Sequence, residues 1–138
     1  MASNDLAQLV DRLMRRIHMG LTARAADFDT ERVGPGGGMI LLAIADLGQP
    51  SMGALARDLA RDKSQLTRAI AGLEGKGLVQ RFASETDARV TEIGLTEFGR
   101  SVVEGLRGGV ADSLAAALPG LSPGEQAKLE ELLRKGLS

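Results

Sequence analysis

Apolar residues recur every three or four positions along most of the chain, which is the spacing of amphipathic helices. The pattern predicts helices over residues 5–21, 39–48, 51–60, 62–75, 96–119 and 122–137. Four of these helices begin with residue types that favour an N-cap, namely Ser51, Asp62, Thr96 and Ser122. We therefore expect four well-defined helix starts after residue 50.

Two of these starts also have the spacing of a capping box, in which the side chains at N-cap and N3 bond reciprocally to the backbone. Ser122 is followed by Glu125, with Pro123 at the first helical position. Asp62 is followed by Gln65 in the form D-x-x-Q. We expect a capping box at both helices.

Two stretches depart from the helical pattern. VQRFA (79–83) and RVTEIGL (89–95) are rich in strand-forming residues, and with SETDA between them they predict a β-hairpin. Residues 27–30 and the glycine-rich GPGGG at 34–38 predict breaks. GPGGG lacks both the lysine and the preceding strand of a phosphate-binding loop, so we interpret it as a flexible connector.

These elements predict a single, mainly α-helical domain of 138 residues with one β-hairpin. Helices 51–60 and 62–75 are joined by a tight turn, which is helix-turn-helix spacing, and the hairpin follows directly. The second helix of the pair has several polar residues in its first two turns, none of which is acidic after Asp62. It is either a solvated surface helix or one whose amino-terminal end recognises a ligand.

Composition narrows the function classes. The chain has no cysteine, one histidine and no tyrosine, which excludes thiol chemistry and leaves no recognisable catalytic constellation. Net charge is −1, yet residues 55–90 hold seven basic and five acidic residues. The longest apolar run, MILLAIA, is too short for a membrane span, and the amino terminus lacks a signal-peptide pattern. We expect a cytoplasmic protein without enzymatic activity, metal or cofactor.

The segment LARDLARDKSQLTRAIAGLEGKGLVQR (55–81), the hairpin residues Asp87 and Arg89, and LTEFG (95–99) together resemble the MarR family of winged helix-turn-helix transcription regulators. The resemblance implies a winged-helix core over 39–99, flanked by dimerisation helices in 1–33 and 100–138. It also implies a homodimer that binds double-stranded DNA at a pseudo-palindromic operator and represses transcription. A small aromatic or phenolic effector is a further partner that the resemblance implies.

The chemistry of the major groove assigns roles along helix 62–75. Gln pairs with adenine and Arg with guanine, so Gln65 and Arg68 are candidates for base recognition. Contacts to phosphates would set the register, and the candidates for them are Lys63, Ser64 and Thr67. The alternatives are that Gln65 only caps its own helix and that Arg68 is a solvated charge.

The hairpin is expected to act as the wing. Arg89 follows the hairpin tip, where its guanidinium would enter the adjacent minor groove. The alternative is an ion pair with Asp87, and both hold if Asp87 orients Arg89. Arg81 is a further candidate for a phosphate contact. Ala88 stands where the family commonly has a second basic residue, so this wing would hold DNA with one arginine fewer.

The apolar stripes at Leu6–Leu21 and Leu129–Leu137 favour dimerisation, and packing onto their own subunit is the alternative. The lone His18 is expected to be structural or at the surface. Phe28, Phe82 and Phe98 are the only aromatic residues that could stack on an effector. A winged-helix module that contacts proteins rather than DNA is the rival function.

Overall fold

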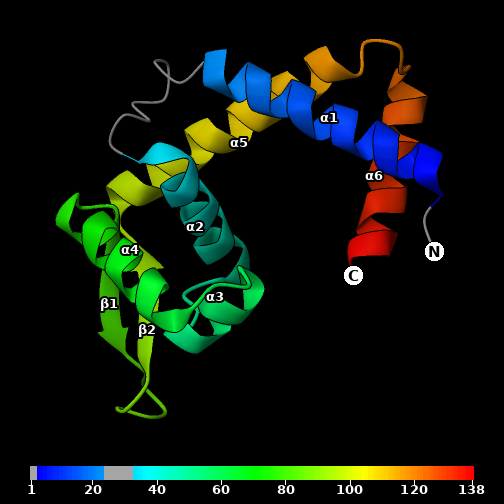
Figure 1. Ribbon diagram of the computed structural model, residues 1–138. Coiled ribbons are helices and arrows are strands. Elements are labelled where there is room, and N and C mark those ends of the chain that lie inside the picture. The colour runs from blue at the N-terminus through cyan, green and yellow to red at the C-terminus, as the bar shows by residue number, and fades with distance from the viewer. Residues whose placement is uncertain (1–2, 24–32) are drawn as a thin grey trace.

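The computed structural model describes residues 3–23 and 33–138, which form six helices and one two-stranded antiparallel sheet (Figure 1). In chain order the elements are α1 (Asn4–Ala23), α2 (Gly34–Leu47), α3 (Met52–Asp58), α4 (Lys63–Gly75), β1 (Val79–Ala83), β2 (Thr91–Leu95), α5 (Glu97–Ala117) and α6 (Pro123–Leu137). The predicted fold class, mainly α with a β-hairpin, is confirmed. None of the helices in the described residues combines the length and apolar character that crossing a bilayer requires.

All four predicted N-caps form. The hydroxyls of Ser51, Thr96 and Ser122 each accept a hydrogen bond from the backbone N–H three residues later. Ser122 and Glu125 complete the predicted capping box, and the backbone N–H of Ser122 lowers the pKa of the Glu125 carboxyl. Asp62 caps α4 through the N–H of Ser64, but among the described residues Gln65 makes no return bond. Only half of that predicted box forms.

The interpretation of GPGGG as a flexible connector is wrong, because α2 begins at Gly34 and includes all five residues. Proline is tolerated in a first helical turn, where its missing N–H has no partner to lose. A Cβ at Gly37 would lie 3.1 Å from Val33 Cγ1 and 3.3 Å from Leu73 Cδ2. The missing side chain at Gly37 therefore leaves room for Val33 and for Leu73 of α4 at the start of α2. The break predicted at 27–30 lies outside the described residues.

The hydrophobic core lies among α2, α3, α4, the sheet and the first half of α5. Its centre consists of side chains with no exposed surface: Leu41, Leu55, Leu66, Ile70, Leu78 and Ile93. The predicted apolar face of α4 thus supplies the core, while its polar face stays outside. This arrangement makes the helix-turn-helix and the hairpin one packed unit.

The sheet pairs β1 and β2 from Val79↔Leu95 to Ala83↔Thr91. The second strand begins two residues later than predicted, because Val90 belongs to the turn. The N–H of Ser84 donates to the Val90 carbonyl, and the N–H of Val90 donates to the Asp87 carbonyl, both at 2.9 Å. The hairpin projects from the body of the molecule as a wing (Figure 1).

The long helix α5 leaves the core and packs along α1, and α6 lies at the same end of the molecule (Figure 1). Along α5, Phe98 in the first turn is 40% exposed, whereas the buried positions include Val103, Ser113 and Ala117. The reason is that α5 faces two different neighbours along its length. No residue of α6 is buried in the single chain.

Candidate nucleic-acid interface

The first two turns of α4 form an exposed polar surface. The side chains of Lys63, Ser64, Gln65 and Arg68 are exposed, and that of Thr67 is half-buried. Leu66 and Ile70 on the opposite side are fully buried, which holds the helix against the core and orients this surface outward. A single rigid element therefore presents all five candidate residues of α4.

Local hydrogen bonds restrict two of these residues. The Ser64 hydroxyl donates to the Asp62 carboxylate at 2.9 Å, and the Thr67 hydroxyl donates to the Lys63 carbonyl at 2.7 Å. A hydroxyl has one proton to donate, so neither can donate to a phosphate without giving up its present bond. Both oxygens can still accept a hydrogen bond, for instance from a base amino group.

Gln65 and Arg68 are differently placed. Within the described residues their side chains form no hydrogen bond or ion pair, and both point away from the core. The alternative that Gln65 caps its own helix therefore finds no support, because the Asp62 carboxylate performs that role. The N–H and hydroxyl of Ser64 lower the pKa of Asp62, so the cap is ionised at neutral pH.

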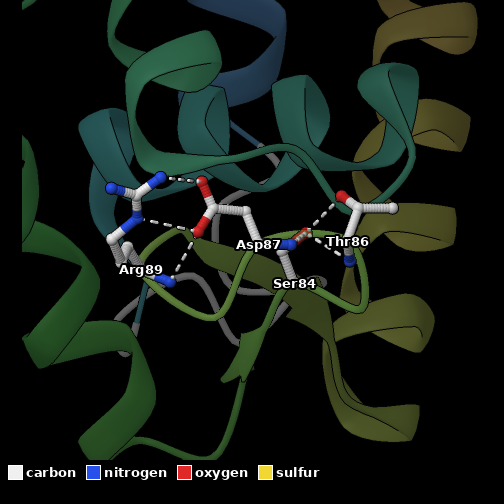
Figure 2. Close-up of polar contacts among 4 residues, drawn as sticks. All are labelled: Ser84, Thr86, Asp87 and Arg89. Atoms are coloured by element: carbon white, nitrogen blue, oxygen red, sulfur yellow. Dashed lines mark hydrogen bonds and ion pairs between the residues drawn. The ribbon is translucent and has the colours of Figure 1, made fainter.

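The wing turn is held by two short networks (Figure 2). The Ser84 hydroxyl accepts weakly from the backbone N–H groups of Thr86 and Asp87, at 3.3 and 3.4 Å. Asp87 accepts from the Arg89 backbone N–H at 3.0 Å and from the guanidinium Nε and Nη2 at 3.1 and 3.3 Å. The predicted alternative of an ion pair within the hairpin is therefore present.

This ion pair does not hide Arg89 from solvent. Its side chain is 91% exposed, whereas that of Asp87 is 40% exposed. The Arg89 guanidinium holds the pKa of the Asp87 carboxyl below its usual range, so the pair persists at neutral pH. The contact fixes one side of the guanidinium, and among the described residues Nη1 forms no hydrogen bond. An arginine oriented in this way remains accessible to a nucleic acid.

Arg81 lies in a different environment from the other candidates. Its Nε is 3.4 Å from Glu74 Oε1 near the carboxyl end of α4, and its side chain is 35% exposed. Arg81 pairs across the sheet with Ile93, which is fully buried, so it lies on the core side of the wing. The structure gives Arg81 a partner within the protein, which the spacing of the sequence did not reveal.

Two exposed cations near α4 were not assigned a role from the sequence. Arg57 in the last turn of α3 and Arg61 in the turn before α4 both have exposed side chains. They belong to the basic excess of residues 55–90, and their position in the turn of a helix-turn-helix was the signal that could have identified them. Exposed cations at this turn suit contacts with a phosphate backbone.

No group of three or more His, Asp or Glu residues in the described part of the chain is arranged to hold a metal ion. The surface just described offers hydrogen-bond donors and positive charge on a helix and a neighbouring wing. Its chemistry is that of binding and recognition.

Comparison with known proteins agrees with this chemistry. The model of the MarR family matches residues 37–91, which span α2, α3, α4 and β1 up to the start of β2. The exopolysaccharide II synthesis transcriptional activator ExpG of Rhizobium meliloti is 32% identical over 103 residues, covering 75% of this chain. The chain spans about half (53%) of the length of that relative.

Solved structures with the same fold extend over the whole chain. The apo form of MarR from E. coli is 24% identical with a TM-score of 0.77, covering 100% of both chains. A cysteine-to-serine mutant of the same protein, solved with operator DNA, is 25% identical with a TM-score of 0.70, covering 98% of this chain and 95% of that one. BpsR from Bordetella bronchiseptica, whose DNA binding is regulated by 6-hydroxynicotinic acid, is 22% identical with a TM-score of 0.71, covering 98% and 100%.

Proposed function

Because the chain belongs to the MarR family of winged-helix transcription regulators, we propose that it acts as a homodimeric repressor at a pseudo-palindromic operator. The observation that carries this proposal is the exposed start of α4 beside an oriented wing arginine. An α-helix fits the major groove, and its first turns bring side chains to the base edges. Gln65 and Arg68 recognise bases, and Arg89 enters the adjacent minor groove.

The remaining contacts set the register on the phosphate backbone. Lys63 is exposed and charged, and Arg57 and Arg61 extend the same positive surface across the turn. Ser64 and Thr67 reach a phosphate only after exchanging their present bonds, because a phosphate oxygen accepts a hydrogen bond and has no proton to donate. Arg81 is not among these phosphate contacts, because its guanidinium forms an ion pair with Glu74.

Dimerisation is supported by apolar surface on the terminal helices. Leu132 is 53% exposed and Leu137 83%, although both are leucines on a helix that the sequence makes amphipathic. Between α1 and the α5–α6 end lies a groove of about 570 Å³ with mainly apolar lining, including Leu9, Leu13 and Leu129. A second copy that fills this groove would bury these side chains and bring two recognition helices to half-sites about 34–36 Å apart.

Regulation by a small aromatic or phenolic ligand is part of the proposal. BpsR supports it, because 6-hydroxynicotinic acid is an aromatic acid that regulates DNA binding by that protein. A ligand that prefers one arrangement of the two recognition helices would shift the population between DNA-binding states. Release would be tested with a panel of aromatic carboxylates and phenols added to the protein–DNA complex.

The direction of transcriptional control is proposed as repression. ExpG is a transcriptional activator, so the same scaffold supports the opposite outcome in a relative. A site that overlaps a promoter gives repression, and a site upstream of it gives activation. A reporter assay with the natural upstream region distinguishes the two.

The test of the proposal is fluorescence anisotropy with a duplex selected from a random-sequence library, titrated at several salt concentrations. Arg68→Ala should weaken binding by about 1–3 kcal/mol and relax preference at one base pair. Arg89→Ala should weaken binding as well. Arg15→Ala is the matched control, because it also removes an exposed arginine but lies on α1, paired with Asp11.

Salt dependence separates the outcomes. Specific binding should weaken as salt rises, because counterions are released from the phosphates that the protein neutralises. If no duplex is bound, selected sequences included, the DNA-binding function is wrong and the rival protein-contact module takes its place. Unchanged affinity in both Arg68→Ala and Arg89→Ala would overturn the assigned interface but not the function.

A further inference from the structure

Thr96 connects α5 to the segment that follows α4, the proposed recognition helix. Its hydroxyl donates to the Gly77 carbonyl at 2.6 Å and accepts from the Gly99 N–H at 2.9 Å. Its backbone N–H donates to the Leu78 carbonyl at 3.1 Å. Gly77 and Leu78 form the corner between α4 and β1, which we call the α4–β1 corner. One residue thus caps α5 and bonds twice to this corner.

Gly99 makes the same junction a close backbone contact. A Cβ at Gly99 would lie 2.0 Å from the Leu78 carbonyl oxygen, a distance at which any side chain collides with the main chain. The first turn of α5 therefore rests directly on the α4–β1 corner. Because the corner joins α4 to the wing, displacement of α5 at this point displaces both DNA-contacting elements.

The other end of α5 is tied to the amino-terminal helix. Arg16 on α1 donates from Nη1 to the Ala117 carbonyl at 3.0 Å, in the last turn of α5. Figure 1 shows α5 as the single helix that runs from the winged-helix core to the end where α1 and α6 lie. A helix bonded at both ends transmits position between them.

The bond to the corner distinguishes Thr96 from the other helix caps. Ser51 and Ser122 also accept from the N–H three residues on, at 3.0 and 3.2 Å. Among the described N-cap hydroxyls that accept at N3, only that of Thr96 also donates to a carbonyl outside its own helix. Capping alone would not require the donated bond.

We propose that Thr96 is a positioning residue that fixes the recognition helix and wing relative to α5. Through α5 it sets the distance between the two recognition helices of the dimer, so it determines which half-site spacing the protein accepts. This inference rests on the proposed dimeric DNA-binding function.

The experiment measures spacing discrimination. The probe is a duplex selected by the wild-type protein from a random-sequence library, together with versions that carry one base pair more or fewer at the centre. One base pair moves a half-site by about 3.4 Å and turns it by about 35°. The quantity compared is the ratio of affinities for the selected and altered spacings, which does not depend on the fraction of folded protein.

Four variants separate the bond from Thr96 to the α4–β1 corner from the role of Thr96 as the N-cap of α5. Thr96→Asp keeps an acceptor for the Gly99 N–H but has no proton for the Gly77 carbonyl. Thr96→Val removes the hydroxyl without adding a charge, and serves if the aspartate variant does not fold. Thr96→Ser keeps both bonds. Ser51→Ala is the matched control, because it loses an N-cap without touching the corner.

We expect Thr96→Asp and Thr96→Val to lower the discrimination ratio by about two- to thirtyfold, the range for residues that couple two sites. Thr96→Ser and Ser51→Ala should keep the wild-type ratio. A wild-type ratio in Thr96→Asp or Thr96→Val overturns the inference and leaves the regulator proposal intact. A wild-type protein indifferent to spacing, or without specific binding, instead overturns the dimeric operator complex, and this inference falls with it.

Discussion

The winged-helix core and the terminal helices differ in how much of their apolar surface the single chain buries. In the core, Leu55, Leu66 and Ile70 have no exposed surface, and the polar face of α4 lies outside. On α6 no residue is buried, and Leu132 and Leu133 remain about half exposed, at 53% and 48%. The same apolar periodicity therefore has two different outcomes in one chain. The first builds a folded core, and the second leaves apolar side chains exposed in the single chain.

The difference separates the surface proposed to contact DNA from the surface proposed to form the dimer. The core holds Gln65, Arg68 and Arg89 on elements fixed by buried contacts or by local hydrogen bonds. The terminal helices offer no comparable polar surface, but they offer apolar area at the position where a second subunit would fit. Substitutions in the terminal helices should therefore change dimerisation, and substitutions in the core should change the free energy of unfolding.

The largest effect is expected from Leu132→Glu. A charge buried in the proposed dimer interface should dissociate the dimer and, by loss of the second half-site contact, weaken operator binding by about 10²–10⁴-fold. Sedimentation and anisotropy measure the two effects. Ala127→Glu, which adds the same charge to the exposed outer face of α6, is the control. A Leu132→Glu protein that stays dimeric would place the interface elsewhere.

A large effect of another kind is expected from Leu66→Ala. Removal of a fully buried leucine leaves a cavity and should lower the free energy of unfolding by about 2–5 kcal/mol. Urea denaturation at two protein concentrations gives the size of this loss and shows whether it depends on dimerisation. The loss should be similar at both concentrations, whereas Leu132→Ala should destabilise in a concentration-dependent manner. Equal behaviour of the two variants would contradict the division between core and terminal helices.

A smaller effect is expected where the two regions meet, from Arg16→Ala. The lost bond to the Ala117 carbonyl involves a charged donor, and such bonds contribute about 1.5–3 kcal/mol when partly buried. Thermal unfolding should show that the free energy of unfolding falls by an amount near the low end of that range. Arg15→Ala, which removes the neighbouring exposed arginine of α1, should be nearly neutral. An equal change in both variants would show that the Ala117 bond contributes nothing specific.

The smallest effect is expected from acid, at the wing. The pKa of Asp87 is lowered in the folded protein, so its ion pair contributes at every pH above the unfolded pKa. That contribution is lost as the pH falls from about 4 through the folded pKa. Carboxyl NMR titration should give Asp87 a low midpoint that rises in Arg89→Ala. A midpoint that is the same in wild type and Arg89→Ala would show that the ion pair does not form in solution.

Local signals predicted the elements of the protein well. The caps at Ser51, Asp62, Thr96 and Ser122 and the hairpin at residues 79–95 all form, because capping and turn chemistry act within one turn of backbone. The apolar face of α4 also follows from spacing alone, since burial of Leu66, Ile70 and Leu73 repeats the helical period. With these faces assigned, the exposed polar residues of α4 could be named from the sequence.

Contacts between distant residues decided the rest. GPGGG belongs to α2, where Gly37 lies close to Leu73 of α4, and no rule based on neighbours in sequence includes that contact. Arg81 pairs with Glu74 across the α4–β1 corner, although its position in the strand suggested a phosphate contact. The bond from Thr96 to Gly77 spans 19 residues and joins the α4–β1 corner to α5. Residue types and their spacing were enough to locate the starts of the four capped helices, the apolar face of α4 and the polar residues that α4 exposes. The pairing of charges and the way the elements are held relative to one another follow from the folded chain alone, because both depend on distances that exist only after folding.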